Sequence, residues 1–388
     1  MPEVRLRCKV NTPLFLGDAD QKAELRTPSI IGELRYWFRA LAGKVCDNNL
    51  FKVKIMEEAV FGSQRRAGIR IHVESDLTDN DIQVCDLDTP GIRYLAGMGI
   101  TADCREYIKE DFAFTIVMTG PNILLKAAYN IFLVWTRYGG LGARARKGFG
   151  CINAIDGSDI PEGYLSFLYR YGQEGTNSWN NHYDTVIESF KSLRDFISAR
   201  LSTEERIHWD APFNTPTYLD SPSFTRYARI IYRLDTNNVL NAMNRVGMAL
   251  RNFRIDGHPT TSDYRDTIRP LMQGMTPTST DLKNDVFGLP IPYRSNTLGL
   301  AKTVSWDGTG SGDNRRASPM HINFSRLKKE NDVIFIYVTL IVFKSRFLPD
   351  GKSVTVDATT LDTPPDTKEV ITRLGGILTK PDGFIPVK

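Results

Sequence analysis

The first residues of the chain alternate between apolar and polar side chains, which is the period of a β-strand with one buried face. Every second residue from Val4 to Val10 is apolar, while Arg5, Arg7 and Lys9 make the other face mostly basic. From Thr27 to about Ala42 the apolar residues recur at helical spacing. The start of the chain therefore predicts a half-buried strand followed by an amphipathic helix.

Strand and helix patterns continue along the chain, and Gly43 is expected to end the first helix. The later patterns are a helix over 122–138, a strand over 149–155, a helix over 184–201, a strand over 223–234, a helix over 237–253 and a hairpin of strands over 321–327 and 333–343. The apolar run over 333–343 is too short for a membrane helix and suits a buried strand. This order predicts an α+β fold made of sandwiches with one open sheet face.

The most informative segment follows the helix over 122–138. Residues 139–150 read GGLGARARKGFG, with five glycines, three basic residues and no acid. Glycine lets a backbone approach phosphate oxygens closely, and basic side chains add charge there. We therefore interpret this glycine loop as a phosphate-binding segment. Its candidate binding residues are Gly140, Gly142, Arg144, Arg146, Lys147 and Gly148.

Two familiar nucleotide-binding motifs do not explain the glycine loop. The dinucleotide fingerprint needs a strand before its glycines and a helix after them, and here the predicted order is reversed. A P-loop needs the spacing G-x-x-x-x-G-K-[ST], which does not occur here. The remaining alternative is a helix C-cap followed by a solvated basic turn.

A short pattern occurs twice and indicates an internal duplication. The first copy has Val60-Phe61-Gly62, then Arg65-Arg66, then an alternating strand over 69–73. The second copy has Val286-Phe287-Gly288, then Arg315-Arg316, then an alternating strand over 320–324, with an insertion over 289–314. We predict one unit over residues 1–155, a connecting insertion with one helix over 156–222, and a second unit over 223–388.

Composition excludes several classes of protein. The chain has 388 residues, is 41% hydrophobic and 24% charged, and carries a formal net charge of +4, which permits an anionic partner. Its five cysteines include no C-x-x-C pair and its N-terminus has no signal-peptide pattern, so we expect reduced thiols in a cytoplasmic protein. The five histidines are scattered, so the sequence predicts no catalytic triad, no metal site and no cofactor.

Several of these motifs together resemble the RAMP superfamily of CRISPR systems. The closer similarity is to the first-numbered subunits of the type III-B effector, the Cmr complex. The segments that carry the resemblance are Thr12-Pro13-Leu14-Phe15-Leu16-Gly17, LRTPSIIGELRYWFRAL over 25–41, Val60-Phe61-Gly62-Ser63, the glycine loop and Arg315-Arg316-Ala317-Ser318-Pro319.

The resemblance implies two tandem ferredoxin-like (RRM-like) RAMP domains with a partly helical connecting insertion. It implies a non-catalytic RNA-binding subunit of a ribonucleoprotein, which helps to capture target RNA at the end distal to the guide's 5′ tag. The expected partners are the CRISPR guide RNA, the target RNA and other RAMP subunits, with no membrane.

Other basic residues are weaker candidates for RNA contact. Arg35 and Arg39 lie about one turn apart on the first helix, where a solvated face is the alternative. Arg65, Arg66, Arg315 and Arg316 hold equivalent repeat positions, where structural pairing with acids is the alternative. For Arg5, Arg7 and Lys9, the alternative is an edge strand whose charges prevent aggregation.

Two other functions stay open at the sequence level. Some RAMP proteins are metal-independent ribonucleases that process CRISPR transcripts, with histidine or tyrosine as general base. A purely protein-bridging subunit is the other alternative, and it predicts that the basic residues of the glycine loop are dispensable.

Overall fold

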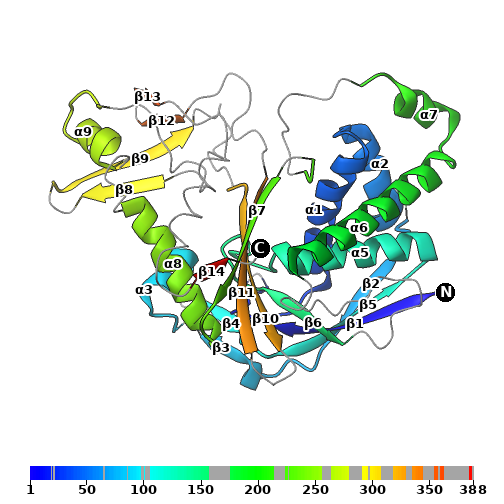
Figure 1. The fold of residues 1–388 in the computed structure, drawn as a ribbon, viewed down its shortest axis with the longest axis horizontal. Coiled ribbons are helices and arrows are strands. Elements are labelled where there is room, and N and C mark those ends of the chain that lie inside the picture. Colours follow the sequence, from blue (N-terminus) through cyan, green and yellow to red (C-terminus); the bar gives the residue numbers. More distant parts are fainter. Residues whose placement is uncertain are drawn as a thin grey trace.

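The computed structural model of this chain is shown in Figure 1. The residues that it describes are 1–18, 20, 22–63, 66–84, 86–97, 100, 105–156, 175–213, 223–225, 227–255, 264–278, 291–295, 298–306, 318–328, 334–343, 354–356, 359–361 and 384–386. None of the helices among them is long and apolar enough to cross a lipid bilayer.

The elements of the first half confirm a mixed α and β chain. They are β1 (Glu3–Val10), α1 (Thr27–Val45), α2 (Leu50–Phe61), β2 (Arg70–Glu74), β3 (Ile82–Val84), α3 (Pro90–Ala96), β4 (Glu106–Ile108), β5 (Ala113–Thr119), α5 (Asn122–Tyr138) and β6 (Ile152–Asp156). The alternation predicted for β1 is present, since its apolar residues are buried and its charged ones are not. The helix predicted over 122–138 has these bounds in the structure.

The second half adds helices and two more four-stranded sheets. Its elements are α6 (Gly175–Ser198), α7 (Thr203–Asp210), β7 (Tyr227–Leu234), α8 (Val239–Ile255), α9 (Arg269–Met272), β8 (Ile291–Ser295), β9 (Leu300–Trp306), β10 (Met320–Lys328), β11 (Ile334–Phe343), β12 (Val354–Val356), β13 (Thr359–Leu361) and β14 (Phe384–Pro386). Helices α6 and α7 pack on the first half, α6 against α1, α2 and α5, and α7 against α2.

The two main sheets have the same strand order. The first sheet runs β2-β5-β1-β6 and the second β10-β11-β7-β14, with antiparallel pairing throughout. If the strands of each sheet are numbered in the order in which they occur in the chain, both sheets read second, third, first, fourth from one edge to the other. The strands that the sequence repeat equates, β2 and β10, therefore occupy the same position in their sheets.

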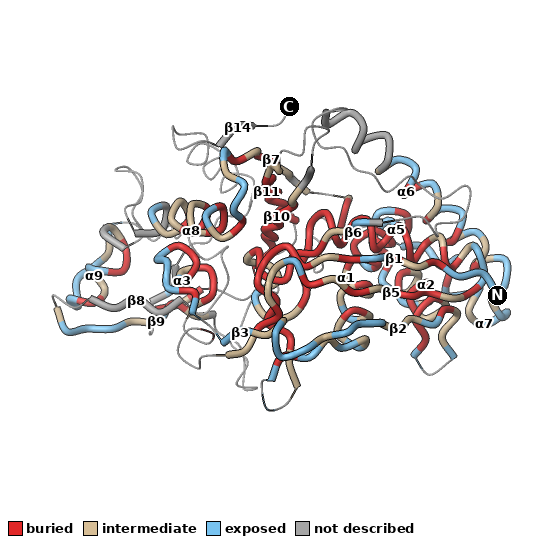
Figure 2. Tube along the Cα trace, turned by 90° about the horizontal axis from the view of Figure 1, so that it is seen from below, coloured by how far each residue is buried: buried red, intermediate tan, exposed pale blue. Residues whose placement is uncertain are grey.

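Helix α5 lies between these two sheets. Every residue from Ala127 to Tyr138 is buried. The helix packs against β1, β5 and β6 of the first sheet and against β10 and β11 of the second. Figure 2 shows β10 and β11 in the buried centre of the molecule. Since even the polar residues Asn130, Thr136 and Arg137 are buried, protein encloses this part of the helix on every side.

The prediction of one open sheet face in each half is wrong for the second sheet. Helix α8 covers one face, where Phe324 and Val338 share a core with Met243. The other face carries Ile341 and Phe343, which belong to the apolar core of the first half. The continuous apolar run of β11 is what a strand covered on both faces requires, but it does not tell which elements cover those faces.

A second contact joins the halves away from α5. Helix α3 packs against α8, and the N–H of Gly91 donates to Asn244 Oδ1 at 2.8 Å. A Cβ at Gly91 or Gly247 would overlap the backbone of the opposite helix, so the two glycines permit this close approach.

Three other details differ from the sequence predictions. The connecting insertion over 156–222 was predicted with one helix and contains two, α6 and α7. Helix α1 continues past Gly43 to Val45, and a Cβ at Gly43 would lie 2.9 Å from Ser223 Oγ, so this glycine serves packing within the helix. The insertion over 289–314 contains β8 and β9, which belong to a third sheet of order β13-β12-β9-β8 at one end of the molecule (Figure 1). The repeat motif over 286–288 lies outside the described residues.

Asn323 on β10 tests the attachment of the second sheet to α5. Its Nδ2 donates to the carbonyl oxygens of Thr136, at 3.1 Å, and Gly139, at 2.6 Å, and the residue is fully buried. Because Asn323→Ala leaves both carbonyls without this donor, we expect it to lower the free energy of unfolding by about 2–3 kcal/mol in urea titrations. The exposed Asn241→Ala is the control, with an expected change within about 0.5 kcal/mol. If both variants had the same urea midpoint of unfolding, this role of Asn323 would be contradicted.

Candidate nucleic-acid interface

The glycine loop over 139–150 folds back on itself directly after α5. The N–H of Leu141 donates to the carbonyl of Gly150 at 2.8 Å and closes the loop. Gly142, Gly148 and Gly150 have φ angles of 81°, 85° and 62°, in the left-handed region that favours glycine. A Cβ at Gly150 would also overlap the carbonyl of Leu141. The shape of this loop therefore depends on glycine at these positions.

The same glycines bring the loop against the rest of the protein. The N–H of Ala143 donates to the carbonyl of Phe15 at 2.7 Å, and a Cβ at Gly142 would overlap that carbonyl. A Cβ at Gly148 would overlap the ring of Phe324 on β10. Gly140 is buried, and a Cβ there would overlap the carbonyl of Phe149. The structure thus gives Gly140, Gly142 and Gly148 a packing role, and their contact with RNA stays a prediction.

The glycine loop completes the free edge of the second sheet. The N–H of Ile322 on β10 donates to the carbonyl of Arg146 at 3.1 Å, and Lys147 forms a parallel bridge with Ile322. Further along this edge, the carbonyl of Phe324 accepts from Asn11 Nδ2 at 3.2 Å and that of Arg326 from Asn153 Nδ2 at 2.7 Å. The first half therefore supplies the partners that an edge strand otherwise lacks.

The three basic side chains of the loop lie in different surroundings. Arg144 is exposed, and its backbone has a φ of 61°. Its guanidinium packs over Gly97, where an added Cβ would come within 2.7 Å of it. Arg146 is half-buried, donates through Nη1 to the carbonyl of Ser318 at 2.9 Å, and lies 5.3 Å from the ring centroid of Tyr36. Lys147 is half-buried as well.

A polar cluster surrounds Arg146 where the halves meet, and we call it the junction cluster: Glu33, Tyr36, Arg146, Ser318 and His321. The hydroxyl of Tyr36 on α1 lies 2.8 Å from His321 Nε2 on β10. Burial, followed by the charges of Arg146 and Lys147, lowers the pKa of His321 well below its ordinary value. His321 is therefore neutral at pH 7.

Glu33 is the acidic member of the junction cluster. Burial raises its pKa from 4.5 to about 7, and the positive charge of Arg146 opposes part of that increase. Burial also raises the pKa of Tyr36 to about 12. Near neutral pH, protonation of Glu33 removes the acidic charge beside Arg146 and leaves the cluster more positive.

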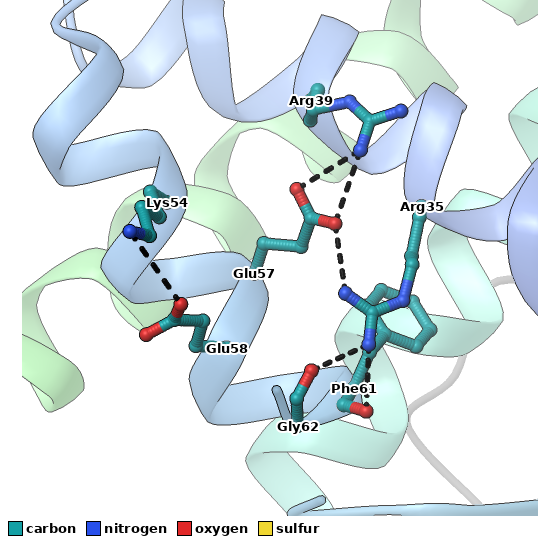
Figure 3. Close-up of polar contacts among 7 residues, drawn as sticks. All are labelled: Arg35, Arg39, Lys54, Glu57, Glu58, Phe61 and Gly62. Carbon is teal, nitrogen blue, oxygen red and sulfur yellow. Dashed lines mark hydrogen bonds and ion pairs between the residues drawn. The ribbon is translucent and has the colours of Figure 1, made fainter. Parts of the chain in front are cut away.

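Arg35 and Arg39 are not free cations. Both pair with Glu57 on α2, with Arg35 Nη1 at 2.9 Å and Arg39 Nη1 at 3.1 Å from Glu57 Oε1 (Figure 3). Arg35 also donates to the carbonyls of Phe61 and Gly62. Since 47% of the Arg39 side chain is exposed against 27% for Arg35, Arg39 retains more capacity for a ligand.

The double arginines of the repeat are described only in part. Arg66 is exposed, whereas Arg65, Arg315 and Arg316 lie outside the described residues. Ser318, which accepts from Arg146, is two positions beyond Arg316 in the sequence. Within the described residues, no group of three or more histidine, cysteine or acidic side chains is placed to hold a metal ion.

Comparison with known proteins identifies the first half. The RAMP superfamily profile matches residues 7–153. We refer to residues 7–153, which this profile matches, as the RAMP domain. The match includes α5 and the whole glycine loop, and it stops within β6.

Two curated proteins of Pyrococcus furiosus are similar to part of this chain. CRISPR system Cmr subunit Cmr1-2 is 42% identical over 69 residues, which is 18% of this chain and 36% of that protein. CRISPR system Cmr subunit Cmr1-1 is 28% identical over 141 residues, which is 35% of this chain and 42% of that protein. These matches thus span about two fifths of the relatives' length.

Two solved structures share the fold over most of the chain. The crystal structure of Cmr1 from Pyrococcus furiosus in its apo form has a TM-score of 0.58 at 17% identity and covers 90% of both chains. A chain of the type III-B Cmr-beta complex bound to cognate target RNA has a TM-score of 0.53 at 12% identity, covering 97% of this chain and 99% of that one. The fold similarity therefore extends well beyond the RAMP domain.

Sequence reasoning missed most of the junction cluster. Tyr36 falls within a motif that identifies the RAMP domain, but nothing local marks it as a partner of His321, which is 285 positions away. In the sequence, His321 is one of five scattered histidines that indicate no shared site. The one signal in the sequence was the spacing of Glu33 and Tyr36. They are three positions apart on the helix that carries the RAMP motif, so they share a face of that helix.

The raised pKa of Glu33 predicts a pH-dependent stability. Between about pH 4.5 and 7 folded Glu33 keeps a proton that the unfolded chain has lost, so the free energy of unfolding falls as pH rises through this window. Glu33→Gln removes the ionisation. At pH 8 we expect the free energy of unfolding of the variant, measured in urea titrations, to be higher than that of the natural protein by on the order of 1–3 kcal/mol. Near pH 4.5 we expect the two free energies to be equal.

Glu188→Gln on α6 is the matched control for Glu33→Gln, since 67% of the Glu188 side chain is exposed. It is expected to follow the natural protein at every pH. A Glu33→Gln difference that stayed constant from pH 4.5 to pH 8 would show that the Glu33 pKa is ordinary.

Proposed function

We propose that this chain is a non-catalytic RNA-binding subunit of a type III-B CRISPR effector ribonucleoprotein. In this proposal it binds beside other RAMP subunits and helps to capture target RNA at the end distal to the guide's 5′ tag. The observation that carries the proposal is the position of Arg146 and Lys147. Their loop belongs to the RAMP domain and borders β10 of the second half, so an RNA bound there contacts both halves.

The duplicated strand order supports two tandem ferredoxin-like domains. In the first half the order β1, α1, β2, β5, α5, β6 is the β-α-β-β-α-β arrangement of that fold. The second sheet repeats the strand order around α8. We infer that the second half is a second RAMP-like domain, which agrees with a fold similarity that covers nearly the whole chain.

The charge of the junction suits a phosphate ligand. Arg146 is held by Ser318 and Tyr36, so its guanidinium is already ordered before RNA arrives. Exposed Arg144 and half-buried Lys147 follow the same loop. Protein–RNA contacts of this kind gain affinity from neutralised phosphates without reading bases. One of the structural relatives is bound to cognate target RNA, which favours target RNA as the ligand.

The surroundings of His321 support a role without catalysis. The histidine is only 3% exposed, and its Nε2 faces the hydroxyl of Tyr36. Such a residue is poorly placed to take a proton from a ribose hydroxyl, because a general base must reach its substrate. Exposed His72, by contrast, lies 3.5 Å from Glu74, away from the junction cluster.

Removal of the loop's charges tests the RNA-binding proposal. Arg144→Gln, Arg146→Gln and Lys147→Gln combined are expected to weaken capture of target RNA by the assembled complex. The slope of log K against log salt reaches about −0.7 for each phosphate neutralised on a single strand, so the variant should show a slope shallower by up to about 2. The measurement is fluorescence anisotropy with labelled RNA at several salt concentrations.

The matched control combines Lys54→Gln, Lys191→Gln and Arg206→Gln, three exposed cations on α2, α6 and α7. It changes the net charge equally and is expected to keep the natural slope. If the loop variant also kept that slope while remaining folded by circular dichroism, the loop would serve packing or assembly only.

The absence of catalysis is tested directly with the purified chain. We expect a labelled CRISPR repeat RNA to remain intact after prolonged incubation with the protein and a chelator. Site-specific cleavage, lost in His321→Ala or Tyr36→Phe, would replace the proposed role with that of a processing ribonuclease.

A further inference from the structure

The first sheet has a helix-free face that carries several cations. Helices α1, α2, α5 and α6 lie on its other side (Figure 1). On the helix-free face, Arg5 of β1 pairs in register with Val117 of β5, which pairs with His72 of β2. The adjacent rows place Arg7 between Asp156 of β6 and Thr115 of β5, with Glu74 next in line, and Glu3 beside Thr119 and Arg70. We call this surface the β1–β2 face.

Protection of a sheet edge does not explain the cations of β1. The strand order places β1 between β5 and β6, and from Arg7 to Lys9 the strand pairs with a neighbour on each side. Charges that discourage edge-to-edge pairing are needed only where backbone groups are unpaired. Arg7 and Lys9 lie in this doubly paired part of β1, so edge protection does not explain them.

The acids near this face neutralise only part of its charge. Arg5 pairs with Glu3 and Glu74, and Lys9 pairs with Asp111 at 2.8 Å. Arg7 and Arg70 are exposed, and neither has an acidic partner within the described part of the chain. Two arginines thus remain available on opposite sides of β5, one on an interior strand and one on the edge.

The positions between the cations are small or buried. They hold Thr115, Val117 and Thr119, and Val117 is fully covered by its neighbours. RNA-binding sheets that read bases stack them on several aromatic side chains, and these rows hold no Phe, Tyr or Trp and a single His72, which lies 3.5 Å from Glu74. Protein interfaces are also enriched in large aromatic residues, which are missing from the same rows. The remaining chemistry is charge and hydroxyl groups, which suits a sugar–phosphate backbone.

We propose that the β1–β2 face is a second RNA-binding surface, which holds the backbone of a single strand through Arg7 and Arg70 without reading its sequence. Same-face residues on an antiparallel strand recur about every 6.8 Å, so Arg5, Arg7 and Lys9 form an evenly spaced row along β1. The surface shares no residue with the glycine loop. It goes beyond the proposed function, because it extends the RNA path across the outer side of the RAMP domain.

The test uses the full chain and labelled single-stranded RNA, uridine-only and adenosine-only, of equal length. Combined Arg7→Gln and Arg70→Gln is expected to weaken binding of both RNAs equally and to make the log–log salt slope shallower by up to about 1.4. Combined Arg7→Lys and Arg70→Lys keeps the charges and is expected to retain the natural slope. Lys54→Gln with Lys191→Gln controls for net charge and is expected to leave binding unchanged.

Several outcomes would overturn the inference. If the Arg7→Gln, Arg70→Gln variant kept the log–log salt slope of the natural protein, phosphate contact on this face would be excluded. Loss of binding by the glycine-loop variant in the same experiment would still support the proposed function. Loss of binding to only one of the two RNAs would show base reading. Normal RNA binding with failed assembly into the effector complex would assign the face to a protein partner. No binding of any RNA by the natural chain would contradict both proposals.

Discussion

The arrangement of this protein depends on a helix that has no solvent face over most of its length. From Ala127 onwards α5 is buried, with the first sheet on one side and β10 and β11 on the other. Each large apolar side chain enclosed in this way contributes roughly 1.5–3 kcal/mol. Because α5 serves the cores of both halves at once, neither half can rotate against the other without exposing it. The two halves are therefore one cooperative body in this region.

This constraint also sets the geometry of the candidate interface. The glycine loop begins where α5 ends, so its position is fixed by the helix and by contacts to Phe15 and Ile322. The junction cluster forms because α1 and β10 meet beside the loop, and Tyr36 and His321 join across that contact. The charged groups beside this contact between α1, β10 and the glycine loop are held in place before a ligand arrives. Such preorganisation limits the entropy lost on binding.

The sequence predicted local elements well and their surroundings poorly. The period-two pattern of β1 and the helical pattern of α5 appear where expected, because each depends on neighbours a few positions apart. The repeat also identified β2 and β10 as equivalent, as their positions in the two sheets confirm. The sequence did not reveal the pairing of Arg35 and Arg39 with Glu57, and it did not reveal which two layers bury the faces of β11. Such features depend on tertiary packing, which sequence period does not encode.

The covered edge of β10 has a consequence for how the protein is made. Its outward hydrogen-bonding groups are satisfied by Asn11, Arg146 and Asn153, all of which leave the ribosome before β10 does. During synthesis the second sheet can thus form against a surface that already exists. If β10 were synthesised first, its edge would remain unpaired until the first half had formed. Unpaired strand edges can exchange between chains or aggregate. Chain direction and topology together favour vectorial folding, with the first half acting as the template for the second.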